Sequence, residues 1–135
     1  MTYHRGTETI LLVDDEESLR HVVVDLLSQL GYRMLSAAGG PEALALAQAH
    51  SGKIDVLVTD VVMDPLAGPA LAEKLLHFRP EMKVIYISGY ADALAPGGVL
   101  KPGTVLLNKP FTIKLLSAKV REVLGNPASA STAPS

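Results

Sequence analysis

Five polar residues of this chain each follow a short apolar run: Asp14, Asp15, Asp60, Ser88 and Lys109. Three carboxylates brought together would repel one another, so at neutral pH they would raise their pKa values or take up a cation. A hard divalent ion, Mg²⁺ or Mn²⁺, suits such an all-oxygen site. A metal ion, a lysine ammonium and a hydroxyl around one carboxylate are the groups that phosphoryl transfer requires, which makes Asp60 the candidate nucleophile.

The apolar runs that would position these residues have the length and β-branched content of buried strands. We expect strands at residues 10–13, 33–37, 55–59, 83–87 and 105–107. Because the runs are continuously apolar rather than alternating, they predict a parallel sheet covered on both faces, a doubly wound α/β fold. Ligands of such sheets bind outside the carboxyl ends of the strands. One acid at a strand end is more often a helix cap or a solvated charge, but the five positions together predict a site.

Helical periodicity between the strands predicts the layers that cover the sheet. A first helix is expected from residue 19 to a stop at Gly31. Its apolar positions are Leu19, Val22, Val23, Leu26, Leu27 and Leu30. A second helix is expected at 41–49, and a third begins at Gly68 with an apolar face of Leu71, Leu75 and Phe78. A weak helical stretch at 90–95 breaks at 96–98, and a last helix follows the capping Thr112. The apolar face of that last helix consists of Ile113, Leu116, Val120 and Val123.

Composition and charge narrow the class of protein. A chain of 135 residues with 48% hydrophobic and 19% charged residues is typical of one globular domain. The formal net charge of −2 provides no basic field, so we expect no nucleic-acid partner. The absence of cysteine excludes a thiolate metal site and fits a reducing compartment. No apolar run approaches the roughly 18 residues of a membrane span, so we expect a cytoplasmic location without direct membrane contact.

The two ends of the chain differ from its centre. Residues 125–135 are almost entirely small or polar and cannot bury enough surface to offset the entropy of ordering them. We therefore expect a flexible segment at 1–8, one domain at 9–124 and a disordered tail at 125–135.

Four short motifs occur in the same order as the predicted strand ends. They are Val13-Asp14-Asp15-Glu16, Thr59-Asp60-Val61-Val62-Met63, Ile87-Ser88-Gly89-Tyr90 and Asn108-Lys109-Pro110-Phe111. The chain thereby resembles the receiver domains of bacterial response regulators, over about residues 9 to 124. The resemblance implies a flavodoxin-like, five-stranded parallel sheet of order 2-1-3-4-5 with helices on both faces. The sequence at residues 6–15 and 107–112 is also similar, more loosely, to that of the carboxyl-terminal receivers of hybrid sensor histidine kinases.

The resemblance also implies roles for the residues of these motifs. Asp15 and Asp60 would bind Mg²⁺ directly, Asp14 would bind it through water, and the backbone carbonyl of Val62 would complete the protein ligands. Asp60 would take the phosphoryl group from a phosphohistidine of a histidine kinase or a histidine phosphotransfer protein. Lys109 would pair with the phosphoryl oxygens, and Ser88 would move to hydrogen-bond them. Gly89 would leave the site open, and the Lys109–Pro110 peptide bond would be cis.

Two positions depart from the family pattern. Asp64 stands where the family usually has proline, and it either adds metal affinity or points to solvent. Leu106 stands where the family commonly has Tyr or Phe, so the usual aromatic switch cannot operate there. We expect Leu106 to pack in the core, with Tyr90 as a candidate signalling residue in its place.

Two other functions, a phosphatase and a docking module, are alternatives to the phosphoacceptor function. Haloacid-dehalogenase-like phosphatases also use a nucleophilic aspartate with Mg²⁺, but they carry a second aspartate where this chain has Val62, which cannot move a proton. We therefore expect no enzyme that turns over an external phosphate ester. The remaining alternative is a docking module of the same fold that binds its partner without being phosphorylated.

Overall fold

Five parallel strands form one sheet in the order β2-β1-β3-β4-β5. The computed structural model describes residues 6–63, 66–88 and 105–125. The strands are β1 (Thr9–Val13), β2 (Arg33–Ala37), β3 (Val56–Asp60), β4 (Lys83–Ser88) and β5 (Val105–Asn108). This order confirms the predicted doubly wound α/β fold with a flavodoxin-like sheet.

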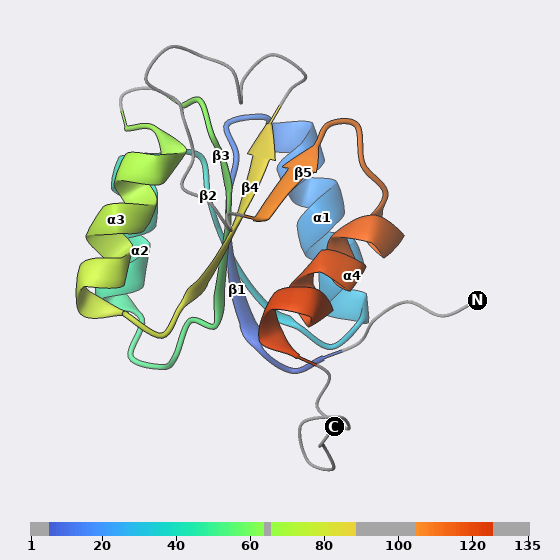
Figure 1. Ribbon diagram of the computed structural model, residues 1–135, viewed down its shortest axis with the longest axis horizontal. Helices are drawn as coiled ribbons and strands as arrows, with labels where there is room; N and C mark the ends of the chain where they lie inside the picture. Colours follow the sequence, from blue (N-terminus) through green and yellow to red (C-terminus); the bar gives the residue numbers. More distant parts are fainter. Residues whose placement is uncertain (1–5, 64–65, 89–104, 126–135) are drawn as a thin grey trace.

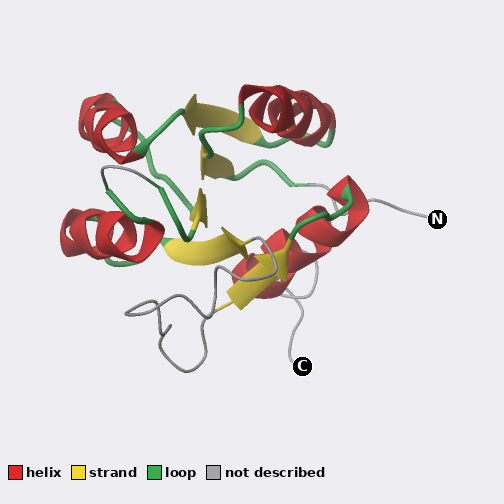
Figure 2. Cartoon of the chain, turned by 90° about the horizontal axis from the view of Figure 1, so that it is seen from above, coloured by secondary structure: helices red, strands yellow, loops and turns green. Residues whose placement is uncertain are grey.

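Helices cover both faces of the sheet, as predicted. They are α1 (Glu17–Gln29), α2 (Gly40–Ala49), α3 (Gly68–Phe78) and α4 (Ile113–Leu124). Helices α1 and α4 lie on one face, and α2 and α3 lie on the other (Figure 1). The view from above shows the sheet between these two layers (Figure 2).

The central strands are buried on both faces, which explains why their sequences are continuously apolar. Every residue of β1 and of β3 is buried. Because side chains alternate along a strand, Ile10 and Leu12 pack toward α1 and α4, whereas Leu11 and Val13 pack toward α2 and α3. The sheet therefore separates two apolar cores, and neither face of β1 or β3 tolerates a charge except at the strand ends.

The register of the strands aligns their carboxyl ends. Val13 of β1 pairs with Thr59 of β3, so the residues that follow, Asp14 and Asp60, emerge side by side. Asp60 in turn pairs with Ile87, one residue before the end of β4. The chain leaves β1 for β2 on one side and later enters β3 on the other, so strand order reverses between β1 and β3. This is the point at which the fold class predicts a ligand site.

Two predicted helix faces are wider than the faces that the structure buries. Val22 was assigned to the apolar face of α1, but it is 50% exposed, because the sheet is contacted by Val23 and Leu27. Phe78 was assigned to the buried face of α3, but it is 44% exposed. Phe78 is the last residue of that helix, and its ring lies beside the guanidinium of Arg79 instead of in the core.

The segment that precedes β1 contacts the body of the domain. The backbone N–H of Gly6 donates to the Leu30 carbonyl, and the Glu8 carboxylate pairs with Arg121 of α4. Gly31 has a φ of 104°, as predicted for the stop after α1, and a Cβ there would lie against the Gly6 carbonyl oxygen. The predictions for residues 1–5, 90–95, 96–98 and 126–135, and those for Asp64, Gly89 and Tyr90, lie outside the described residues.

Candidate metal centre

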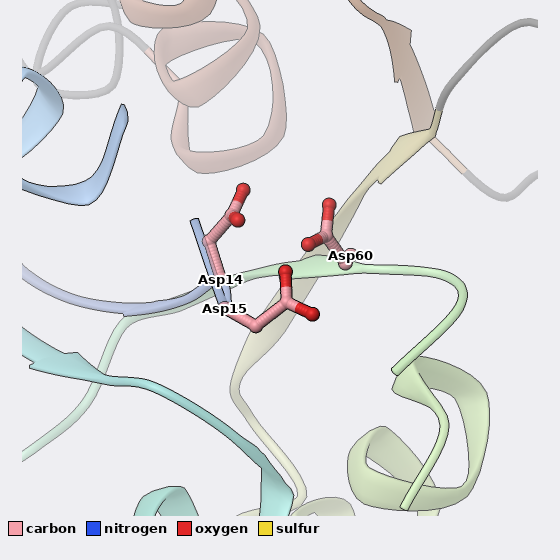
Figure 3. Close-up of side chains that lie close together, drawn as sticks. All are labelled: Asp14, Asp15 and Asp60. Carbon is pink, nitrogen blue, oxygen red and sulfur yellow. The ribbon is translucent and has the colours of Figure 1, made fainter. Parts of the chain in front are cut away.

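Three carboxylates converge at the carboxyl ends of β1 and β3. Asp14 and Asp15 follow β1, and Asp60 ends β3. One carboxylate oxygen from each lies within 4.8 Å of those of the other two. Figure 3 shows the three side chains turned toward a common space. Asp14 is fully buried and Asp60 is 6% exposed, whereas Asp15 faces solvent, so an ion held here would keep one side open to water.

Asp14 is held by hydrogen bonds on nearly all of its polar atoms. Its N–H donates to the Ala37 carbonyl at 3.2 Å, and its Oδ1 accepts from the Glu16 N–H at 2.8 Å. Its carbonyl oxygen accepts from Nη1 of Arg20 at 2.7 Å. Oδ2, however, is buried and has no hydrogen-bond partner in the described part of the chain. A buried carboxylate oxygen without a hydrogen bond is costly, and the nearest positive charge to Oδ2 is the Lys109 ammonium, which is shared with two other carboxylates.

Lys109 supplies the positive charge nearest to this cluster. Its Nζ lies 3.2 Å from Oδ1 of Asp60, 3.4 Å from Oδ2 of Asp14 and 3.8 Å from Oε1 of Glu16. Its backbone N–H donates to the Ser88 carbonyl at 2.8 Å, which ties the end of β5 to the end of β4. The Lys109–Pro110 peptide bond is cis, as the resemblance implied.

The electrostatics of the cluster show an excess of negative charge. Burial, together with the neighbouring Asp14 carboxylate, raises the pKa of Asp60 from 3.8 to about 7, against the opposing effect of Lys109. Burial alone would lower the pKa of Lys109, but the Asp60 and Asp14 carboxylates outweigh it and hold this pKa above its ordinary value. One ammonium therefore does not neutralise the site, and the donor set of carboxylate oxygens fits a hard divalent cation.

The chain after Asp60 is folded closely over the strand end. The Asp60 carbonyl accepts from the Thr59 hydroxyl at 3.1 Å, and Gly68 N–H donates to the Val61 carbonyl at 2.9 Å. A Cβ on Gly68 would clash with the Asp60 carbonyl oxygen, so only glycine allows α3 to begin this close to the site. The Val62 side chain is 53% exposed beside it.

Ser88 ends the neighbouring strand, but its described partner is not one of the three aspartates. Its side chain is fully buried, and its hydroxyl donates to Oδ1 of Asn108 at a long 3.5 Å. The structure thus brings Asp14, Asp15, Asp60 and Lys109 together, and it sets Ser88 one strand away in contact with β5.

Comparisons with known proteins agree with this geometry. The model of the response regulator receiver domain matches residues 10–121. The chain belongs to the response regulator receiver domain family. It is 40% identical over 120 residues to the sensor kinase CckA of Brucella abortus (strain 2308). The aligned region covers 88% of this chain and 13% of that protein. It is 29% identical to the response regulator receiver protein CpdR of the same organism, over 85% of this chain and 95% of CpdR.

A solved structure gives the same result. The crystal structure of the receiver domain from the hybrid histidine kinase CckA superposes with a TM-score of 0.72 at 35% identity, covering 86% of this chain and 98% of that one. The protein is therefore a signalling module of the two-component type. Since the chain spans only 13% of the sensor kinase that it matches, that kinase's other activities are not assigned to it. None of the described helices has the length and apolar character needed to cross a bilayer.

One departure of this receiver domain from the family pattern can be located. Leu106 is half-buried, pairs with Tyr86 of β4 and packs against the core beneath α2 and α3. The expected packing of Leu106 is thus seen, although less deeply than a fully buried core position.

Two contacts of the site were not assigned from the sequence. Glu16 reaches Lys109, and Arg20 donates to the Asp14 carbonyl. One signal was present: Arg20 follows Glu16 by four residues, which places both on the same side of the helical turn beside the end of β1. Nothing in the spacing indicated that the guanidinium would bind the main chain.

Proposed function

We propose that this receiver domain accepts a phosphoryl group on Asp60 with Mg²⁺ bound beside it, Mn²⁺ being able to substitute. The observation that carries the proposal is the convergence of three carboxylates with one lysine, whose single positive charge lies against both Asp14 and Asp60 and cannot neutralise the cluster. Asp14, Asp15, Asp60 and the backbone carbonyl of Val62 would hold the ion. When bound, Mg²⁺ would neutralise charge on the phosphoryl oxygens.

The chain's own residues would divide the transfer step among them. A carboxylate oxygen of Asp60 attacks the phosphorus of a phosphohistidine, the new O–P bond forms an acyl phosphate, and the N–P bond breaks. The imidazole keeps the electron pair of that bond. The Lys109 ammonium, which lies 3.2 Å from Asp60, would pair with the transferred oxygens. Ser88 would hydrogen-bond the phosphoryl group after leaving Asn108.

The partner in this proposal is a histidine kinase or a histidine phosphotransfer protein, acting in the cytoplasm. Similarity to a sensor kinase and to a stand-alone receiver protein supports a place in a phosphorelay. No separate substrate is turned over in this proposal, because Val62 occupies the position where phosphatases of similar chemistry carry an acid/base aspartate. The proposed functional unit is residues 9–124, with residues 6–8 held against it through Gly6 and Glu8 rather than flexible, and with a disordered tail after it. Neither nucleic acid nor membrane is a partner in this proposal.

The deciding measurement is intact mass after incubation with Mg²⁺ and acetyl phosphate. We expect one phosphoryl adduct on the wild type, none on Asp60→Asn and none after chelation of the metal. Asp25→Asn, which removes an exposed carboxylate of α1, is the matched control and should keep the adduct. A folded, metal-binding wild type that takes no adduct from this donor or from a panel of histidine kinases would favour the phosphorylation-independent docking module.

A further inference from the structure

Arg20 makes a contact that the phosphoryl chemistry itself does not require. It lies in α1, close after Glu17 where that helix begins, and its Nη1 donates to the carbonyl oxygen of Asp14 at 2.7 Å. The distance is that of a strong, charge-assisted hydrogen bond. In the described part of the chain, Arg20 has no carboxylate within ion-pair distance, so its charge is directed at the main chain.

The peptide group that Arg20 binds joins two of the three carboxylate residues. The Asp14 carbonyl belongs to the peptide bond between Asp14 and Asp15, so fixing it restricts the direction in which both side chains leave the strand. Asp14 otherwise donates its N–H to the Ala37 carbonyl and accepts on Oδ1 from the Glu16 N–H. Without Arg20, this peptide would keep no described hydrogen bond on its carbonyl side.

We propose that Arg20 is a positioning residue for the metal centre, holding the Asp14–Asp15 peptide so that both carboxylates converge with Asp60. This inference rests on the metal-binding part of the proposed function. Groups that orient metal ligands are commonly worth 10–100-fold in metal affinity, and the contact is made before any phosphoryl group arrives.

Positioning and electrostatics predict opposite effects of removing Arg20. The guanidinium is a positive charge near a cation site, so its charge alone opposes metal binding, and neutralising it would tighten Mg²⁺ binding. Its hydrogen bond keeps the ligands in place, and losing that bond would weaken Mg²⁺ binding. The sign of the change therefore separates the two effects.

The test is a calorimetric titration of Mg²⁺ into the wild type, Arg20→Gln and a matched control, Arg79→Gln. Arg79 also donates to backbone carbonyls, those of Gly52, Ala47 and His50 at 2.8–3.0 Å, but at the opposite end of the sheet. We expect Arg20→Gln to raise the dissociation constant for Mg²⁺ about tenfold. Arg79→Gln should lower stability and leave that constant unchanged. A dissociation constant for Arg20→Gln equal to or below that of the wild type overturns the proposal.

A second variant, Arg20→Lys, and a measurement of amide hydrogen exchange test the proposal independently. Arg20→Lys keeps the charge but shortens the donor, so its dissociation constant should lie between those of wild type and Arg20→Gln. If Arg20→Gln does not fold, an unchanged constant in Arg20→Lys overturns the proposal. In metal-free protein, exchange of the Glu16 amide hydrogen, which is bonded to Asp14 Oδ1, should accelerate in Arg20→Gln but not in Arg79→Gln.

Phosphorylation from acetyl phosphate distinguishes a failure of the Arg20 proposal from a failure of the proposed phosphoacceptor function. In Arg20→Gln the half-saturating Mg²⁺ concentration should rise about tenfold, while the rate at saturating Mg²⁺ returns to that of wild type. A wild type that neither binds Mg²⁺ nor takes an adduct would remove the proposed function itself. A wild type that does both, with Arg20→Gln indistinguishable from it, would remove the role of Arg20 alone.

Discussion

The two ends of the sheet bury charge in opposite ways. At the carboxyl end, the carboxylates of Asp14, Asp60 and Glu16 share one ammonium, and the Asp15 carboxylate adds a further negative charge to the cluster. At the amino end, Arg121 is only 7% exposed, and its Nη2 lies 2.5 Å from the carboxylate of Glu8. The guanidinium also lies 5.7 Å from the centre of the Tyr32 ring, which is a cation–π distance.

This difference separates stability from function within one fold. A buried charge that has its counter-ion helps to hold the chain together, and removing one partner is expensive. A buried charge without enough counter-ion weakens the fold until a ligand supplies one. The amino end therefore ties the segment before β1 to α4, whereas the carboxyl end is left incomplete in a way that a cation and a phosphoryl group can complete.

The largest effect should come from breaking the amino-end pair. Arg121→Met leaves Glu8 without its counter-ion and should lower the free energy of unfolding by about 3 kcal/mol, measured by urea denaturation. Its Mg²⁺ dissociation constant should equal that of the wild type. The double variant with Glu8→Gln should regain part of the loss. A parallel loss of Mg²⁺ affinity in Arg121→Met would show that the two ends are coupled and would break the comparison.

Removing a charge at the carboxyl end of the sheet should raise the free energy of unfolding, whereas removing Arg121 at the amino end lowers it. Asp60 has its pKa raised from 3.8 to about 7, so the folded state holds an extra proton between these values and stability falls as pH rises through this window. The shift sets an upper bound of about 4 kcal/mol. Asp60→Asn removes the repelling charge but also one of the three carboxylates beside Lys109, so we expect it to stabilise metal-free protein by less than this bound, about 2 kcal/mol near pH 8. That gain should vanish below about pH 4, and a variant less stable than wild type at both pH values would contradict it.

Metal binding should return stability to the carboxyl end. At a Mg²⁺ concentration ten times its dissociation constant, linkage raises the free energy of unfolding by about 1.4 kcal/mol. Thermal unfolding with Mg²⁺ and with a chelator measures this increment. Arg121→Met, although less stable, should show the same increment, because its change lies at the other end. If Mg²⁺ stabilises Asp60→Asn as much as the wild type, the ion binds elsewhere.

Much of the architecture and the centre of the site could be predicted because local sequence encodes them. Continuous apolar runs marked the strands, and the polar residue after each run marked the functional edge. The limits of the helix faces could not be predicted this way. Val22 satisfies the helical period of α1, but whether the period meets the sheet depends on how the helix is rotated, which is set by packing with α4.

Contacts between distant segments could not be predicted from the sequence for a different reason. Arg121 is not one of the predicted apolar positions of the last helix, and nothing in the sequence indicates that it is buried. Glu8 was assigned to a flexible segment. Their pairing depends on the strand order, which brings the start of β1 beside the end of α4. The Arg20 contact with Asp14 has the same character, since a main-chain acceptor leaves no pattern in the sequence.

The smallest expected effect is the acid sensitivity of Glu8, and it opposes the behaviour of Asp60. Burial alone would raise the pKa of Glu8, but the hydrogen bond and the charge of Arg121 hold it below its ordinary value of 4.5. A depressed carboxyl pKa contributes stability above the unfolded-state value and loses it as pH falls through the folded-state value. The difference in unfolding free energy between wild type and Glu8→Gln should therefore shrink as pH is lowered below about 4.5. Urea denaturation at stepped pH measures it, and a difference that does not change with pH would mean that packing, rather than the Arg121 charge, stabilises the amino end.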